Sequence, residues 1–197
     1  MSGAAQPREP SRRLFFALWP DEAARGALAR ATRAAVGACG GRAVPAQSLH
    51  ATLAFLGSVP ERRLGELAEI ARGIAGAFVP ESPLVVRFEA LAHWVGPKIL
   101  VALCAAESRA AHSLADALKH ATRAAGFAPD LKPFHAHVTL GRKVARAPAV
   151  PMTHAVSWTF DGFALIESRT AAHGSAYSVV QSYLLDRREK THSQPQN

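Results

Sequence analysis

The sequence predicts an α+β protein in which helices cover the outer faces of antiparallel-rich sheets. Three helix-like segments are interspersed among strand-like segments in the order β-α-β-α-β-β-α-β-β-β. The last three strands follow one another without crossover helices, which argues against a doubly wound parallel sheet. A length of 197 residues with 49% hydrophobic residues suffices to bury a large core. We therefore expect one domain, or two tightly packed lobes, over residues 12–187.

The first half predicts two strand–helix units. Residues 14–19 form a short apolar run that predicts a buried strand. The tripeptide 20–22 (Pro-Asp-Glu) then predicts a helix to about Gly37, because proline suits the first turn and acidic groups suit the positive end of the helix dipole. Residues 49–56 predict the second strand. Ser58 is predicted to cap the second helix, since Pro60 and Glu61 follow it and apolar residues then recur at helical spacing.

The second half predicts a hairpin, one helix and three further strands. The hairpin turns at Gly96-Pro97, and Gly126 is predicted to end the helix. The predicted strands are 83–94, 98–104, 136–141, 157–166 and 176–185, and the predicted helix is 107–125. The polar segments 1–11 and 188–197 are predicted to be disordered tails.

The composition indicates a cytoplasmic protein that attracts polyanions. The net charge is +8 and the pI is about 10.3, which suits a nucleic-acid substrate without specifying one. The cysteines, Cys39 and Cys104, form no CxxC pair and no disulfide framework. The sequence contains no apolar run long enough for a membrane span and no secretory signal. We expect a monomer in the cytoplasm with no membrane partner.

A short motif occurs twice in predicted strands. Residues 49–53 read Leu-His-Ala-Thr-Leu and residues 136–140 read Ala-His-Val-Thr-Leu. Alternate residues of a strand share a face, so His50 and Thr52 point one way, as do His137 and Thr139. By the same alternation, Phe55 should point away from His50 into the core. Two such strands from pseudo-symmetric lobes would bring the His/Thr pairs together across a cleft.

Paired histidines and threonines suit phosphodiester hydrolysis. One neutral imidazole can take a proton from water while the other, protonated, gives one to the leaving ribose oxygen. The hydroxyls of Thr52 and Thr139 can bind the phosphate oxygens as charge builds. This scheme needs no metal and no other cofactor. A single His-x-Thr is usually structural, but two copies on strands indicate chemistry.

Three further residues are candidate substrate-binding groups. Arg142 can clamp a phosphate, but alternation places it opposite His137 unless the strand bends at Gly141. His135 shares a face with His137, which predicts a position at the rim of the site. Phe16 is a candidate for stacking on a base or ribose.

These motifs resemble the 2H phosphoesterases, and within them the bacterial RNA 2',3'-cyclic phosphodiesterases, also called 2'-5' RNA ligases. The resemblance rests on residues 13–18, 49–57 and 133–142. It implies a bilobal fold with both motifs lining a central groove. It also implies hydrolysis of a terminal 2',3'-cyclic phosphate of RNA to a 2'-phosphate, with 2'-5' joining as a side activity. By this resemblance His50 is the general acid and His137 the general base.

Other functions stay open from the sequence alone. The chain can act on a nucleoside 2',3'-cyclic phosphate, or on another cyclic phosphate such as ADP-ribose 1",2"-cyclic phosphate, because loops set the substrate. It can also be a non-catalytic RNA-binding module. A metal-dependent hydrolase built on His135 and His137 is a third alternative. A serine or cysteine hydrolase is the weakest, since no G-x-S-x-G elbow occurs.

Overall fold

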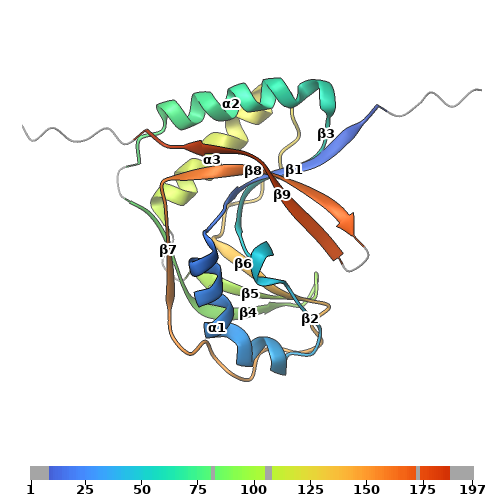
Figure 1. Ribbon diagram of the computed structural model, residues 1–197, viewed down its shortest axis with the longest axis vertical. Coiled ribbons are helices and arrows are strands. Elements are labelled where there is room, and N and C mark those ends of the chain that lie inside the picture. Colours follow the sequence, from blue (N-terminus) through green and yellow to red (C-terminus); the bar gives the residue numbers. More distant parts are fainter. Residues whose placement is uncertain (1–8, 81–82, 105–107, 172–173, 187–197) are drawn as a thin grey trace, which may run out of the picture.

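The computed structural model describes residues 9–80, 83–104, 108–171 and 174–186, and it contains two antiparallel sheets (Figure 1). The four-stranded sheet has the order β3-β1-β8-β9 and the five-stranded sheet the order β2-β6-β5-β4-β7. The strands of the first are β3 (Ala51–Pro60), β1 (Ser11–Leu18), β8 (Gly162–Ala171) and β9 (Gly174–Leu184). Those of the second are β2 (Arg42–Ala43), β6 (His137–Arg142), β5 (Ile99–Cys104), β4 (Leu84–Trp94) and β7 (Val156–Phe160). The predicted α+β class is confirmed.

The helices tie the two sheets together. Helix α1 (Glu22–Ala38) follows β1 of the four-stranded sheet but packs against β6 and β7 of the five-stranded sheet. Helix α3 (Arg109–Ala124) follows β5 of the five-stranded sheet but packs against β3 of the other and against α2 (Leu64–Ala77). Figure 1 shows α2 and α3 above the four-stranded sheet and α1 against the lower one. A single buried cluster accordingly contains residues of both sheets.

Local signals located the helix ends well in two cases. The Asp21 side chain accepts a hydrogen bond from the Ala24 N–H at 2.7 Å, so it caps α1 as an acidic residue at that position should. Gly126 has a φ of +77° just beyond α3, which glycine adopts without steric cost. Glu107, the predicted first residue of this helix, lies outside the described residues, and Ser108 caps it.

The predicted start of the second helix was wrong. Residues 58–60 extend β3, a short 3₁₀ turn spans Glu61–Arg63, and α2 begins at Leu64. Ser58 caps nothing, and its Oγ instead donates to the Ser11 Oγ at 2.7 Å across the β1–β3 pair. Because Ser11 is the first residue of β1, it is not part of a tail. The rest of both predicted tails falls mainly on 1–8 and 187–197, outside the described residues.

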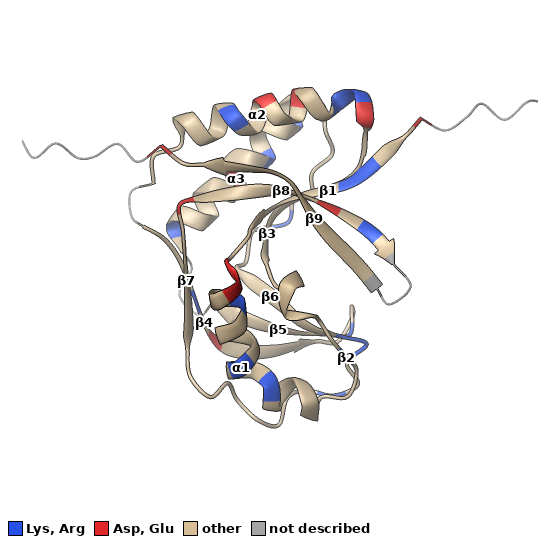
Figure 2. Ribbon diagram, in the orientation of Figure 1, with Lys and Arg blue, Asp and Glu red and all other residues tan. Residues whose placement is uncertain are grey.

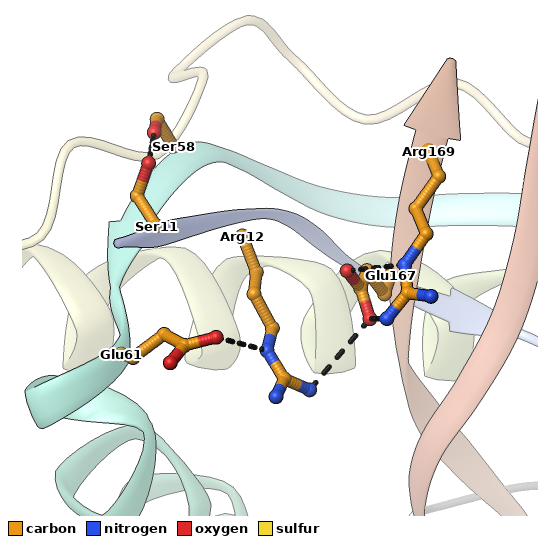
Figure 3. Close-up of polar contacts among 6 residues, drawn as sticks. All are labelled: Ser11, Arg12, Ser58, Glu61, Glu167 and Arg169. Atoms are coloured by element: carbon orange, nitrogen blue, oxygen red, sulfur yellow. Dashed lines mark hydrogen bonds and ion pairs between the residues drawn. The ribbon is translucent and has the colours of Figure 1, made fainter. Parts of the chain in front are cut away.

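An ion-pair network holds β1, the turn after β3 and β8 together (Figure 3). Arg12 contacts Glu61 at 3.0 Å and Glu167 at 3.7 Å, and Arg169 binds both carboxylate oxygens of Glu167. Glu167 is buried, and the Arg169 hydrogen bonds lower the pKa of its carboxyl group. Arg12 therefore serves the fold at this corner.

The strand predicted at 157–166 is two strands in different sheets. β7 ends at Phe160 and β8 begins at Gly162, so the chain passes from the five-stranded to the four-stranded sheet at this point. A Cβ at Gly162 would overlap the Tyr183 carbonyl of β9, which explains glycine at the corner. Hydropathy does not reveal the break, because apolar residues continue on both sides of it. The sequence also gave no signal for the two-residue strand β2.

None of the helices in the described residues is long and apolar enough to cross a membrane.

Candidate active site

Both histidine motifs contain a β-bulge directly after the threonine. In the β1–β3 pair, Ala17 pairs with Thr52 and Phe16 with Ala54, so Leu53 is the extra residue. Leu53 and Ala54 are both buried, and Phe55 returns to the face of Thr52. The alternation that predicted Phe55 to face the core was therefore wrong.

The second motif repeats this irregularity. In the β5–β6 pair, Val101 pairs with Thr139 and Leu100 with Gly141, so Leu140 is the extra residue. Gly141 is buried, and a Cβ there would lie 3.3 Å from the Val144 side chain. Arg142 then lies on the same side as Thr139 and lines the same cavity. The extra residue Leu140, rather than a bend or a strand end at Gly141, brings Arg142 to this side.

The two motifs meet in a cavity of about 220 Å³ between the sheets. His50 directly precedes β3 and Thr52 is the second residue of that strand, whereas His137, Thr139 and Arg142 come from β6. The remaining lining residues are Arg13, Phe15, Phe55, Ser168, Ser175 and Tyr177. The cavity therefore combines two imidazoles, several hydroxyl groups and two guanidinium groups, and none of its described lining residues is a carboxylate.

Each imidazole is held by one backbone carbonyl. The Nδ1 of His50 lies 2.7 Å from the Ser48 carbonyl, and the Nδ1 of His137 lies 2.7 Å from the His135 carbonyl. Because a carbonyl only accepts, Nδ1 carries the proton in both rings. The neutral form therefore keeps Nε2 unprotonated and able to accept a proton, while the cationic form can donate one from Nε2.

His50 lies within a cage of three aromatic rings. Its ring centroid is 4.9 Å from Phe15, 4.9 Å from Tyr177 in an edge-on arrangement, and 5.5 Å from Trp19, which stacks on it. The Arg25 guanidinium lies over the Trp19 ring at 4.4 Å and its Nε donates to the Leu49 carbonyl at 3.2 Å. These contacts fix both the plane and the position of the imidazole.

The surroundings of His50 keep it neutral. Burial is the largest cause that lowers the pKa of His50, to about 4, although the Ser48 carbonyl opposes the change. The positive charges of Arg142 and Arg25, and the neighbouring His137, lower it further. The pKa of His137 is also lowered, again chiefly by burial and against the pull of its own carbonyl partner. Both rings are therefore neutral in the free protein at pH 7.

The other predicted substrate-binding residues lie in three different places. Arg142 donates from Nη2 to the Tyr177 hydroxyl at 3.3 Å, within the cavity. His135 is exposed and lines a second, adjacent cavity together with His137. Phe16 is fully buried and packs edge-on against Phe163 at 5.7 Å, so the structure does not bring it to the site. Its neighbour Phe15 faces the histidines instead.

The adjacent cavity is larger, at about 480 Å³, and borders His137 rather than His50. Trp94 lines this cavity, and the centroid of its ring lies 4.6 Å from that of His137. Its other lining residues are Thr52, Leu53, Phe55, Lys119, Asp130, Lys132, Pro133, Phe134 and His135. Since it contains only one of the two motif histidines, we place the chemistry in the smaller cavity. Within the described part of the chain, no three His, Cys, Asp or Glu side chains form a group that could hold a metal ion.

Comparisons with known proteins identify the family and the fold. A family model described as the 2'-5' RNA ligase superfamily matches residues 19–172. The RNA 2',3'-cyclic phosphodiesterase of Thermus thermophilus is 32% identical over 184 residues, covering 88% of this chain and 90% of that protein. The protein of the same name from Archaeoglobus fulgidus is 33% identical over 150 residues, or 70% of this chain and 76% of that protein. A crystal structure of Escherichia coli LigT complexed with 3'-AMP has a TM-score of 0.79 at 24% identity, covering 90% of this chain and all of that chain.

The two-sheet fold is that of the 2H phosphoesterase class. Within that class, the chain belongs to the 2'-5' RNA ligase superfamily.

Proposed function

We propose that this protein hydrolyses a 2',3'-cyclic phosphate at the end of RNA, or of a nucleoside, to a 2'-phosphate without a metal. The observation that carries the proposal is the meeting of His50 and His137 in one cavity, each with Nδ1 bound to a carbonyl. The curated relatives named RNA 2',3'-cyclic phosphodiesterase support the choice of substrate.

In the proposed reaction, Nε2 of His137 takes a proton from a water molecule that attacks the phosphorus atom. The bond from phosphorus to the 3' oxygen breaks, and Nε2 of protonated His50 gives its proton to that oxygen. The phosphate stays on the 2' oxygen. With a 5'-hydroxyl in place of water, the same steps join RNA ends through a 2'-5' bond.

His50 must gain a proton before it can act as the acid. In the free protein its pKa is about 4, so the bound substrate has to raise it. The cyclic phosphate carries a negative charge, and an opposite charge within about 4–6 Å favours the imidazolium form. Thr52, Thr139 and Arg142 line the same cavity, where their hydroxyl and guanidinium groups suit the non-bridging phosphate oxygens.

The test is cleavage of a short RNA that ends in a 2',3'-cyclic phosphate, with EDTA present and the 2'- and 3'-phosphate products resolved. We expect a 2'-phosphate whose yield EDTA does not change. His50→Ala and His137→Ala should each lower turnover on the order of a hundredfold or more. His120→Ala is the matched control, because His120 also holds a carbonyl through Nδ1 but is exposed on α3.

Two results would contradict the proposal. RNA binding without product would favour a binding module or another cyclic phosphate. Full activity in either motif variant would remove that histidine from the mechanism.

A further inference from the structure

The catalytic cavity is too small for a whole nucleotide. Its volume is about 220 Å³, whereas sites that enclose drug-sized ligands span roughly 300–1,000 Å³. The cyclic phosphate and part of the ribose therefore occupy it, and the rest of the substrate must extend into neighbouring space. Two cavities of about 480 Å³ adjoin it and provide that space.

These two flanking cavities share no lining residue with each other. The first joins the catalytic cavity through Thr52, Phe55 and His137, and the second joins it through Arg142, Ser175 and Tyr177. In a nucleoside 2',3'-cyclic phosphate, the base on C1' and the 5' oxygen beyond C4' extend from the two opposite ends of the ribose ring. The substrate thus has two extensions, and the groove has one flank for each.

The chemistry of the first flank suits a base. Trp94 provides an aromatic face beside His137, and base stacking on such rings is sequence-tolerant. One of the two lysines there is paired, because Lys132 lies 3.6 Å from Asp130. The other, Lys119, is buried and donates its ammonium to the Lys132 carbonyl at 2.7 Å. This flank therefore presents less free positive charge to another phosphate than the second flank does.

The second flank contains two arginines, and none of its described lining residues is acidic. Its polar lining residues besides the arginines are Gln47, Ser48, Ser175 and Tyr177. Arg42 of β2 and Arg142 of β6 are direct cross-strand partners, so their side chains extend from the same face of the sheet. In the described portion of the chain, neither arginine forms an ion pair with a carboxylate. Figure 2 likewise shows basic but no acidic positions around β2.

A cross-strand pair of like charges destabilises a sheet unless an anion lies between them. Arg142 already belongs to the catalytic cavity, whereas Arg42 lines only the second flank. The two arginines therefore form a continuous region of positive charge. It begins at the reacting phosphate in the catalytic cavity and ends in the second flank, where the 5' oxygen of the terminal nucleotide would lie.

We propose that Arg42 binds the phosphate on the 5' oxygen of the terminal nucleotide, so that the enzyme recognises a nucleotide carrying two phosphates rather than a simple cyclic nucleoside phosphate. This inference rests on the proposed function for the position of the terminal ribose. The second phosphate is the last phosphodiester of an RNA chain or the free 5'-phosphate of a small nucleotide.

The test compares the affinities of three reaction products, which are measured without turnover. Adenosine 2'-phosphate has no 5'-phosphate, adenosine 2',5'-bisphosphate has a free one, and adenylyl-(3'→5')-adenosine 2'-phosphate has a phosphodiester there. Arg42→Ala should weaken binding of a ligand with a 5'-phosphate by about tenfold and leave adenosine 2'-phosphate within about twofold. For the same ligands, the slope of the logarithm of the binding constant against the logarithm of the salt concentration should become shallower by about 0.7. Arg33→Ala is the control, because Arg33 is exposed on α1 and its replacement removes the same single positive charge.

A loss confined to the dinucleotide would assign the subsite to RNA, and a loss for both 5'-phosphate ligands would assign it to any 5'-phosphate. Equal losses for all three ligands, or the same loss in Arg33→Ala, would overturn the inference. Failure of the proposed function is a separate result, since it is the absence of cyclic-phosphate cleavage by the unaltered protein.

Discussion

The low pKa of His50 makes the stability of the fold depend on pH. The pKa is about 4 in the folded protein and about 6.5 in an unfolded chain. Between these values the unfolded state binds the proton first, so the free energy of unfolding rises with pH across that window and falls on acidification. At 1.36 kcal/mol per pKa unit, the full difference is up to about 3 kcal/mol, and about 2 kcal/mol of it is lost by pH 5.

Replacing His50 with glutamine should remove this dependence. Glutamine can still donate to the Ser48 carbonyl, which His50 contacts at 2.7 Å, but it does not titrate. Urea unfolding at several pH values between 4 and 7 measures the effect. From pH 7 to pH 4, we expect the free energy of unfolding of the unaltered protein to fall by about 2–3 kcal/mol more than that of the variant. A smaller slope should remain, because the pKa of His137 is also lowered.

The comparison uses the change with pH and not the absolute stability, since glutamine also alters packing in the aromatic cage. His120→Gln, at an exposed position on α3, should keep the slope of the unaltered protein. If His50→Gln and the unaltered protein lose stability in parallel from pH 7 to pH 4, the imidazole is not held neutral by its surroundings. The account of the cage would then be refuted.

Three further predictions concern proton uptake, the sheet corner and the aromatic cage. NMR titration should show the pKa of His50 rising from about 4 when a nucleoside 2'-phosphate binds; an unchanged value would exclude it as the acid. Gly162→Ala should lower the free energy of unfolding in urea by about 2–4 kcal/mol, because the added Cβ would overlap the Tyr183 carbonyl of β9. Gly65→Ala in α2 is the control, since its Cβ would contact no other atom and alanine favours a helix, so this variant should be slightly more stable. Phe15→Leu should mainly lower kcat/KM and Phe16→Leu mainly stability, and the reverse pattern would contradict the assigned faces.

The sequence predicted the parts of the site that depend on local spacing. Two His-x-Thr-Leu segments on strands were enough to expect two facing pairs, and the structure brings all four side chains to one cavity. Asp21 and Gly126 predicted helix ends because capping needs only the residue and its immediate neighbours.

The parts that depend on register between strands were not predictable from the sequence. Strict alternation fails after Thr52 and Thr139, because each strand inserts a bulge that only its pairing partner reveals. The face of β1 was ambiguous for a different reason. Residues 14–18 are all buried, so hydropathy cannot tell that Phe15 faces the histidines while Phe16 faces the core.

The aromatic cage was missed because its members are distant in sequence. Trp19 follows β1 and Tyr177 lies on β9, and only the β1–β8–β9 order brings both to His50. Nothing in a 197-residue sequence read alone links position 19 to position 177.

The two halves of the site are alike in motif and unlike in surroundings, and this difference suits a division of chemical roles. Each histidine uses the same carbonyl contact at 2.7 Å, and each is followed by the same bulge. His50, however, is enclosed by three rings with Arg25 behind one of them, whereas His137 borders the larger cavity beside Trp94. Burial and neighbouring positive charges lower the pKa of His50, so a bound anion has to raise it before this ring can act as an acid. In the proposed reaction the motifs therefore supply the reacting atoms, and residues outside the motifs decide when His50 holds its proton.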